Sequence, residues 1–319
     1  MGHKNMKKWL YVLSTGYILT FFSEHMFWSR VLNGETLLTD YIFVWLAYSL
    51  SGLAMLTVIY RYRVNNILAL FLAGALFGWI TEGIIVQTAY ESLPLSLSFT
   101  GLAWHASISV LVGWHLLPQA LRQGGGQALR WIVAVGGFWG FWAVFWQFED
   151  PATALTNAEF TLYAFGHTLP LMLAYFLADR TAATFDSPRW SAVAVTVFFG
   201  ALFLIVSAFL PVVLVVLTPL LALILWALRR HRQQTAPDSA TMIVGGAIPV
   251  WRYVMLLGIP FTASLVHALL GAVGFLETGY IVYIITVPLG FGLFFWSIWR
   301  FSRPKRPIQA QNPVETPGL

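Results

Sequence analysis

Apolar runs about as long as a membrane crossing repeat along the whole chain, with short polar segments between them. A membrane-spanning helix needs about 20 predominantly apolar residues. The run from 190 to 229 is too long for one crossing, and Pro211 marks the expected break, because proline lacks the backbone donor that a helix interior needs. The pattern predicts ten spans, over residues 9–29, 41–60, 66–88, 97–117, 130–148, 160–178, 190–208, 211–229, 252–273 and 278–300.

The composition supports this interpretation. Of the 319 residues, 58% are hydrophobic and only 10% are charged, whereas soluble domains carry about 25% charged residues. In lipid, backbone polar groups must be satisfied internally, which leaves helices or a closed barrel. Unbroken apolar runs favour helices over the alternating strands of a barrel. The sequence therefore predicts an all-α, polytopic integral membrane helical bundle, formed by a single domain over residues 1–302.

Charged residues change in kind from one polar segment to the next. One set of segments is basic and contains Lys4, Lys7, Lys8, Arg61, Arg63, Arg122, Arg130, Arg180, Arg189, Arg229, Arg230, Arg232, Arg300, Arg303, Lys305 and Arg306. The other set is acidic and contains Glu35, Asp40, Glu91, Glu149, Asp150, Glu159 and Glu277, with Arg30 as the exception. Lys and Arg gather on the cytoplasmic side of membrane proteins, so we expect both termini to be cytoplasmic, with a disordered tail over 303–319.

This distribution also bears on partners and location. The formal charge of +5 does not indicate a nucleic-acid binder, because the basic residues lie between spans and not on a soluble domain. The lipid bilayer is the expected surrounding, and we expect it to be a prokaryotic cytoplasmic membrane. The sequence contains no cysteine, so disulfides and thiolate metal ligands are excluded.

Two stretches, 66–117 and 130–178, share a spacing of glycine and histidine. The pattern recurs at an offset of 62 residues, in Gly74, Gly78 and His105 and again in Gly136, Gly140 and His167. Transporters often contain internal repeats of this kind, and Gly-x-x-x-Gly is also typical of close helix packing. The spacing thus predicts either two related hairpins or two unrelated sites of close packing.

Acids and histidines inside the predicted spans are the main candidates for chemistry, because ionisable groups are costly at membrane depth. His115 lies near the cytoplasmic end and is interpreted as a packing residue, while His25 is expected to point about 100° away from its neighbour toward headgroups or water. The remaining residues lie at a similar depth in the outer half and are predicted to converge on one cavity: Glu24, Glu82, His105, His167 and His267.

Aromatic and acidic residues near this layer extend the candidate site. Trp142 belongs to an interior-depth aromatic cluster and is predicted to line a ligand site. Glu277 and the pair Glu149 and Asp150 are interpreted as solvated loop acids, with an acidic mouth that attracts cations as the alternative.

Two functions fit these features. The first is a transporter of a small neutral or cationic solute, coupled to protons or cations through the layer of Glu and His residues. The second is an intramembrane enzyme that acts on a lipid-like substrate. It would use a divalent metal or haem as cofactor, held by His105, His167, His267 and Glu82, although no spacing such as H-E-x-x-H occurs. No predicted span contains an interior Lys or Arg, which argues against an anionic substrate.

Overall fold

A computed structural model describes residues 3–29, 37–149, 154–236, 239–243, 245–246, 248–274 and 277–303. The described residues form helices and no strand, which confirms the all-α fold class. The elements are α1 (His3–Thr20), η1 (Phe21–His25), α2 (Leu38–Tyr62), α3 (Ile67–Ile80), η2 (Thr81–Ile85), η3 (Thr88–Tyr90), η4 (Leu97–Leu116), α4 (Leu117–Gln123), α5 (Gly125–Ala143), α6 (Trp146–Glu149), α7 (Asn157–Thr181), η6 (Ala182–Thr184), α8 (Arg189–Phe209), α9 (Val212–Gln233), α10 (Val250–Val254), η7 (Met255–Leu257), α11 (Gly258–Ala272) and α12 (Thr278–Ser302).

Nine helical segments in the described part of the chain are long and apolar enough to cross a membrane, as is typical of a multi-pass membrane protein. They match nine of the ten predicted spans, and the predicted break at Pro211 is confirmed, because α8 ends at Phe209 and α9 begins at Val212. The remaining predicted span, 9–29, falls on α1 and η1, which are not among the nine. The predicted tail over 303–319 lies, apart from Arg303, outside the described residues.

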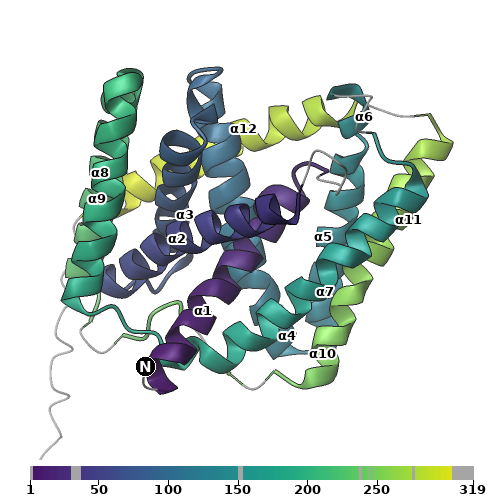
Figure 1. The fold of residues 1–319 in the computed structure, drawn as a ribbon, viewed down its shortest axis with the longest axis horizontal. Coiled ribbons are helices and arrows are strands. Elements are labelled where there is room, and N and C mark those ends of the chain that lie inside the picture. The colour runs from purple at the N-terminus through teal and green to yellow at the C-terminus, as the bar shows by residue number, and fades with distance from the viewer. Residues whose placement is uncertain are drawn as a thin grey trace, which may run out of the picture.

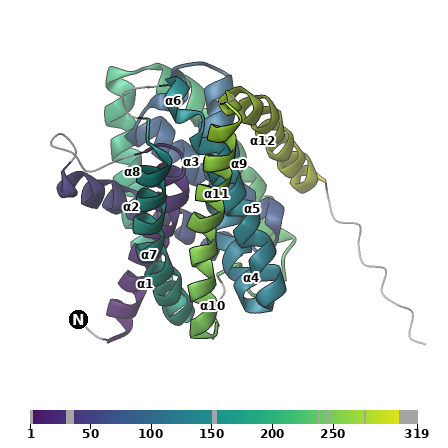
Figure 2. The same ribbon diagram turned by 90° about the vertical axis from the view of Figure 1, so that its right-hand side faces the viewer.

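The helices form a bundle with a buried centre and an apolar periphery. α5, α7 and α11 lie side by side at one edge, α8 and α9 form a hairpin at the other, and α12 crosses the bundle obliquely (Figures 1 and 2). In the most apolar stretch of α3 and η2, 89% of the residues are buried inside the bundle, whereas in that of α8 only 11% are buried. A helix that is apolar on all sides belongs in a core or against lipid, so α3 is central and α8 faces outward.

Three helical segments depart from regular α-helix in the same way. In η1, η2 and at the end of η4, backbone N–H groups bond to the carbonyl five residues earlier, as in Met26 to Phe21 and Val86 to Thr81, both at 2.9 Å. Such π-helical turns widen the helix and are frequent at functional sites. Glu24, Glu82 and His105 all lie in these three segments.

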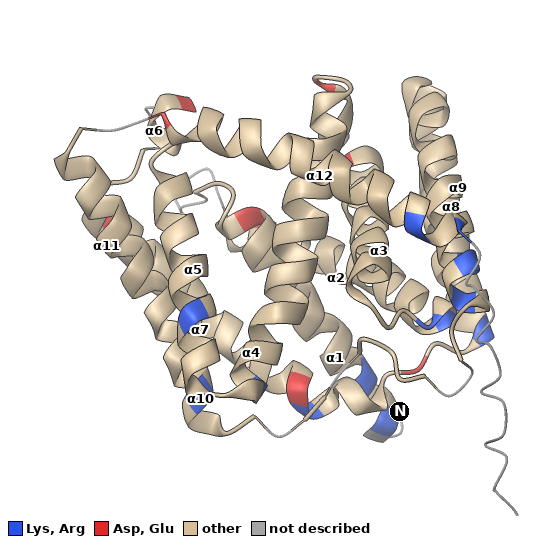
Figure 3. Ribbon diagram, turned by 180° about the vertical axis from the view of Figure 1, so that it is seen from behind, with Lys and Arg blue, Asp and Glu red and all other residues tan. Residues whose placement is uncertain are grey.

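Charges separate toward opposite ends of the bundle. In Figure 3 the Lys and Arg positions gather toward the lower end, and acidic positions mark the upper end. Two acids at the basic end have basic partners. Asp186 lies 3.1 Å from Lys4 and 3.0 Å from Lys8, and Asp179 lies 2.9 Å from Arg122. We call these the basic end and the acidic end.

The two glycine pairs pack against different helices. A Cβ at Gly78 would lie 2.3 Å from the carbonyl oxygen of Gly101, on the helix that carries His105. A Cβ at Gly140 would lie 2.2 Å from the carbonyl oxygen of Ala263, on α11, and not on the helix that carries His167. Both pairs therefore permit close helix approach, while the superposition of 66–117 on 130–178 stays a prediction.

Candidate functional site

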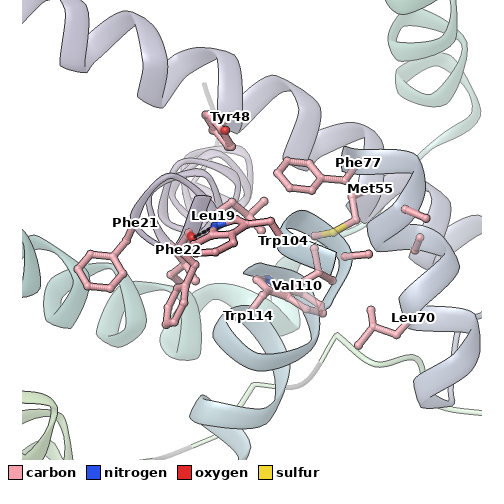
Figure 4. Packing of buried hydrophobic residues seen from close by; sticks show 14 of the residues in the cluster. Leu19, Phe21, Phe22, Tyr48, Met55, Leu70, Phe77, Trp104, Val110 and Trp114 are labelled. Atoms are coloured by element: carbon pink, nitrogen blue, oxygen red, sulfur yellow. Dashed lines mark hydrogen bonds between the residues drawn. The ribbon is translucent and has the colours of Figure 1, made fainter. Parts of the chain in front are cut away.

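The π-helical turn η1 lies at the centre of the candidate site. Its three successive polar side chains reach three different partners. Ser23 hydrogen-bonds to His105, Glu24 accepts a hydrogen bond from Tyr48, and His25 stacks on His167. The carbonyl of Phe22, in the same turn, accepts a hydrogen bond of 2.8 Å from the indole of Trp104, as Figure 4 shows.

A buried acid–imidazole pair is the most polar feature of this region. His105 Nε2 lies 2.6 Å from Glu82 Oε1, and both side chains are buried. The second carboxylate oxygen of Glu82 accepts a hydrogen bond from the Thr88 hydroxyl. A buried charge is tolerated when it is paired and hydrogen-bonded, so these contacts explain how Glu82 is accommodated at this depth.

Two serines on the other side of His105 can satisfy either protonation state of its ring. His105 Nδ1 lies 2.8 Å from Ser23 Oγ, which lies 2.8 Å from Ser109 Oγ. If Nδ1 is unprotonated, Ser23 donates to it and Ser109 donates to Ser23. If Nδ1 is protonated, it donates to Ser23, Ser23 donates to Ser109, and Ser109 donates to the Trp104 carbonyl at 3.3 Å. The imidazole can therefore gain or lose a proton without leaving Ser23 unsatisfied.

Tyr48 connects Glu24 to this pair. Its hydroxyl donates to Glu24 Oε1 at 2.8 Å, and its ring centroid lies 6.0 Å from that of His105. The ring centroid of Tyr48 also lies 5.9 Å from that of Phe77, and Figure 4 shows these two side chains on neighbouring helices. The structure thus brings together three of the predicted site residues: Glu24, Glu82 and His105.

A cavity of about 580 Å³ at the acidic end reaches Glu82. Its acidic lining is Glu82, Glu91, Glu149 and Glu277, and none of the described residues that line it is Lys or Arg. Its aromatic lining is Phe27, Trp28, Phe99, Trp142, Phe145, Tyr280 and Tyr283. We call this space the acidic cavity.

The predicted residue Trp142 forms part of a continuous aromatic wall of this cavity. Its ring centroid lies 5.5 Å from that of Phe27 and 5.0 Å from that of Phe145, and Phe99 lies 4.8 Å from Tyr283. The indole N–H of Trp142 donates to the Phe27 carbonyl at 2.7 Å, which fixes the ring. An aromatic face carries partial negative charge, so both the acids and the aromatic wall favour a positively charged occupant.

The loop acids were interpreted from the sequence as solvated, with an acidic mouth as the alternative. Glu91, Glu149 and Glu277 are exposed and line the same cavity as the buried Glu82. The prediction that Glu149 and Glu277 are solvated is confirmed, the attraction of cations stays a prediction, and Asp150 lies outside the described residues. Charge of one sign in a cleft with apolar walls focuses the electric field and concentrates counter-ions there.

His167 lies in a second cavity, of about 590 Å³, between α2 and α7. Its ring stacks on that of His25 with centroids 3.8 Å apart, and both rings stack on Tyr41 at 5.7 Å. The expectation that His25 points to headgroups or water is wrong, since only 2% of this residue is exposed. The ideal α-helical rotation assumed for it does not apply in the π-helical turn η1.

His267 lies in a third place. Its Nδ1 is 3.2 Å from the side-chain oxygen of Asn157, and its ring stacks on Phe160 with centroids 4.6 Å apart. The prediction that these five side chains share one cavity is wrong: Glu82 lines the acidic cavity, His167 lines the second cavity, and Glu24, His105 and His267 line neither. Similar depth along separate helices did not place these residues on the same side of the bundle.

The separation of the histidines affects the predicted metal site, whose ligands were expected to be His105, His167, His267 and Glu82. His105 and Glu82 are in contact, while His167 and His267 have other neighbours. Within the described ranges, no three His, Asp or Glu side chains are arranged to hold a metal ion. The four residues predicted to hold a divalent metal are therefore not gathered at one point in the described structure.

Sequence reasoning missed several polar residues of the site. Ser23, Tyr48, Thr88 and Ser109 all hydrogen-bond within the network around His105 and Glu82. Serine, threonine and tyrosine are common in membrane helices and have no distinctive spacing here. Only the adjacency of Ser23 to Glu24 and His25 in an otherwise apolar segment gave a local signal.

Comparisons of the chain with known protein families, with curated proteins and with solved structures each gave no match.

Proposed function

We propose that this protein is a membrane transporter that binds a small organic cation in the acidic cavity and exchanges it for a proton. The observation that carries the proposal is the lining of that cavity, where four glutamates and seven aromatic side chains surround about 580 Å³ and extend to the Glu82–His105 pair. Ligand sites typically have volumes of about 300–1,000 Å³.

The chemistry of the lining selects the class of solute. A cation over an aromatic face gains about 0.5–2 kcal/mol, and Trp142, Phe99 and Tyr283 supply such faces. Aromatic walls favour an organic ammonium or similar cation over a small hydrated metal ion. An anion would meet four carboxylates and no basic side chain among the described lining residues.

Proton coupling follows from the charge of the buried pair. With His105 protonated, the positive imidazolium compensates the negative Glu82, and the pair is neutral overall. When His105 loses its proton, the negative charge of Glu82 remains at the wall of the cavity and attracts a cation. The protonated imidazole and the solute therefore compete for the negative charge of Glu82, which is the requirement for exchange.

The proposed topology has ten spans, with both termini at the basic end in the cytoplasm of a prokaryotic cell. The positive-inside rule supports this orientation, and the acidic cavity then opens to the outside. The helix α1–η1 would be the tenth span, with its polar side chains turned into the bundle. Its buried Ser14, Thr15 and Thr20 support that position.

The test is direct binding of tetraphenylphosphonium to purified protein in lipid nanodiscs, with empty nanodiscs as the blank. We expect tighter binding at pH 8 than at pH 5, and release of protons to a weakly buffered solution on binding. Glu82→Gln should weaken binding by about tenfold or more, because a nearby opposite charge is lost. Asp40→Asn removes a partly exposed acid at the start of α2 that does not line the cavity and is the matched control.

Transport itself is tested in proteoliposomes. An acidic interior should drive uptake of the same cation, and Glu82→Gln should abolish the pH-driven component. Saturable binding that is indifferent to both pH and Glu82→Gln would contradict the proposal, as would the absence of binding above the blank.

A further inference from the structure

The second cavity differs from the acidic cavity in both chemistry and surroundings. It lies between α2 and α7 and has a volume of about 590 Å³. Its rim includes Leu38, Ile42 and Leu162, which are 66%, 43% and 76% exposed. Exposed leucine and isoleucine in a membrane bundle face lipid, so this cavity opens sideways to the bilayer. A ligand would reach it from the lipid phase.

Most polar groups of this cavity are already hydrogen-bonded within the protein. The Tyr17 hydroxyl donates to a backbone carbonyl at 3.2 Å, the Trp45 indole does so at 2.8 Å, and Thr20 does so at 2.8 Å. Glu159 caps the start of α7 by accepting hydrogen bonds from Thr156. The imidazole of His167 is different, because no group among the described residues hydrogen-bonds to its ring nitrogens.

The walls around His167 are flat rings. His25 and Tyr41 stack on it, and Tyr163 meets it edge-on with centroids 4.4 Å apart. Aromatic side chains pack best against another flat ring, offset or edge-on. A neutral imidazole offers one N–H donor and one acceptor, so it can bind a carbonyl or a hydroxyl oxygen. No Lys or Arg is among the described lining residues, which disfavours a phosphate or carboxylate headgroup.

We infer that this cavity binds a neutral, membrane-soluble molecule with an oxygen-bearing ring, of the quinone or quinol class, hydrogen-bonded to His167. The ring would lie against Tyr41 and Tyr163, and an apolar tail would leave the cavity past Leu162 into the bilayer. The site is separate from the acidic cavity and does not depend on the proposed transport of cations.

Photolabelling tests this inference on the full-length protein in nanodiscs. The probe is an azido-substituted benzoquinone with a decyl tail, with unlabelled decylbenzoquinone as competitor, and labelled peptides are mapped by mass spectrometry. We expect the label on α2 and α7 near His167. His167→Phe keeps a flat ring but removes the hydrogen bond, and should weaken the competition by about three- to tenfold.

A matched pair of variants tests the lateral opening. Leu162→Trp should block the rim and suppress labelling, whereas Leu173→Trp makes the same change at a lipid-facing position of α7 that does not line the cavity. Thermal unfolding of His167→Phe should match that of the unaltered protein, which shows that the variant is folded. Label spread over lipid-facing positions of α8, or labelling indifferent to both His167→Phe and Leu162→Trp, would overturn the inference.

Discussion

At the residue scale, a buried carboxylate at the basic end holds several segments together. The Asp179 side chain is 1% exposed and pairs with Arg122. It also accepts hydrogen bonds from the backbone of Gly246 and Ile248 at 3.0 and 3.2 Å, and from the Tyr253 hydroxyl at 3.1 Å. One side chain thus joins α4, α7, the segment before α10 and α10 itself. No feature of the sequence distinguished Asp179 from the other charged residues between the predicted spans.

Replacing Asp179 by Ala should destabilise the protein by about 3 kcal/mol or more, because a buried ionic partner is removed and several donors lose their acceptor. Thermal unfolding of the purified protein in detergent measures the change. Asp186→Ala is the matched control, since Asp186 is 40% exposed and an exposed ion pair contributes about 0–1 kcal/mol. Equal effects of the two substitutions would show that Asp179 has no special role.

The Asp186 carboxyl also has a predictable dependence on pH. Hydrogen bonds from Lys8 and then Lys4 lower the pKa of Asp186 below its ordinary value. Its small contribution to stability is therefore complete above the ordinary carboxyl pKa and is lost as the pH falls through the lowered value. The unfolding temperature should thus fall less between pH 6 and pH 3 in Asp186→Asn than in the unaltered protein. An equal fall in both would contradict this assignment.

At the element scale, the approach of α5 to α11 depends on glycine at one position. A Cβ at Gly140 would lie 2.2 Å from the Ala263 carbonyl oxygen, whereas a Cβ at Gly137 would meet nothing within 4 Å. Gly140→Ala should therefore cost about 1–3 kcal/mol through overpacking. Gly137→Ala, on the same helix, should be neutral or stabilising by up to about 1 kcal/mol. Thermal unfolding of both variants checks the difference, and a loss of stability in Gly137→Ala alone would contradict the packing.

The π-helical turns, also features of single elements, determine the geometry of the candidate site. Apolar periodicity gave the helices and their approximate ends, but not the π-helical turns at η1, η2 and η4. A π-helical turn arises when tertiary contacts stabilise a wider hydrogen-bonding pattern. No particular amino-acid composition marks such a turn, so it cannot be predicted from the sequence. Because η1 is such a turn, the direction assigned to His25 from ideal α-helical geometry was wrong.

At the scale of the whole molecule, the separation of charge predicts an orientation that can be measured. The chain has no cysteine, so a single introduced thiol is unambiguous. Ser92→Cys, at the acidic end, should react in intact cells with a thiol reagent that cannot cross the membrane. Ala240→Cys, at the basic end and also exposed, should react only after the cells are opened. The reverse labelling would show that the orientation is inverted.

The sequence alone determined that this protein is a helical, multi-pass membrane protein, because lipid demands long apolar helices and that demand is local in the chain. It also identified Glu24, Glu82 and His105 as unusual, because an ionisable group inside an apolar run is conspicuous wherever it folds. The tertiary structure decided how these groups are shared between sites. Depth along a helix follows from residue number, but the rotation of a helix and its neighbours follow from packing. Packing joined Glu82 to His105 and the loop acids, stacked His167 on His25 in a separate cavity, and placed His267 against Phe160.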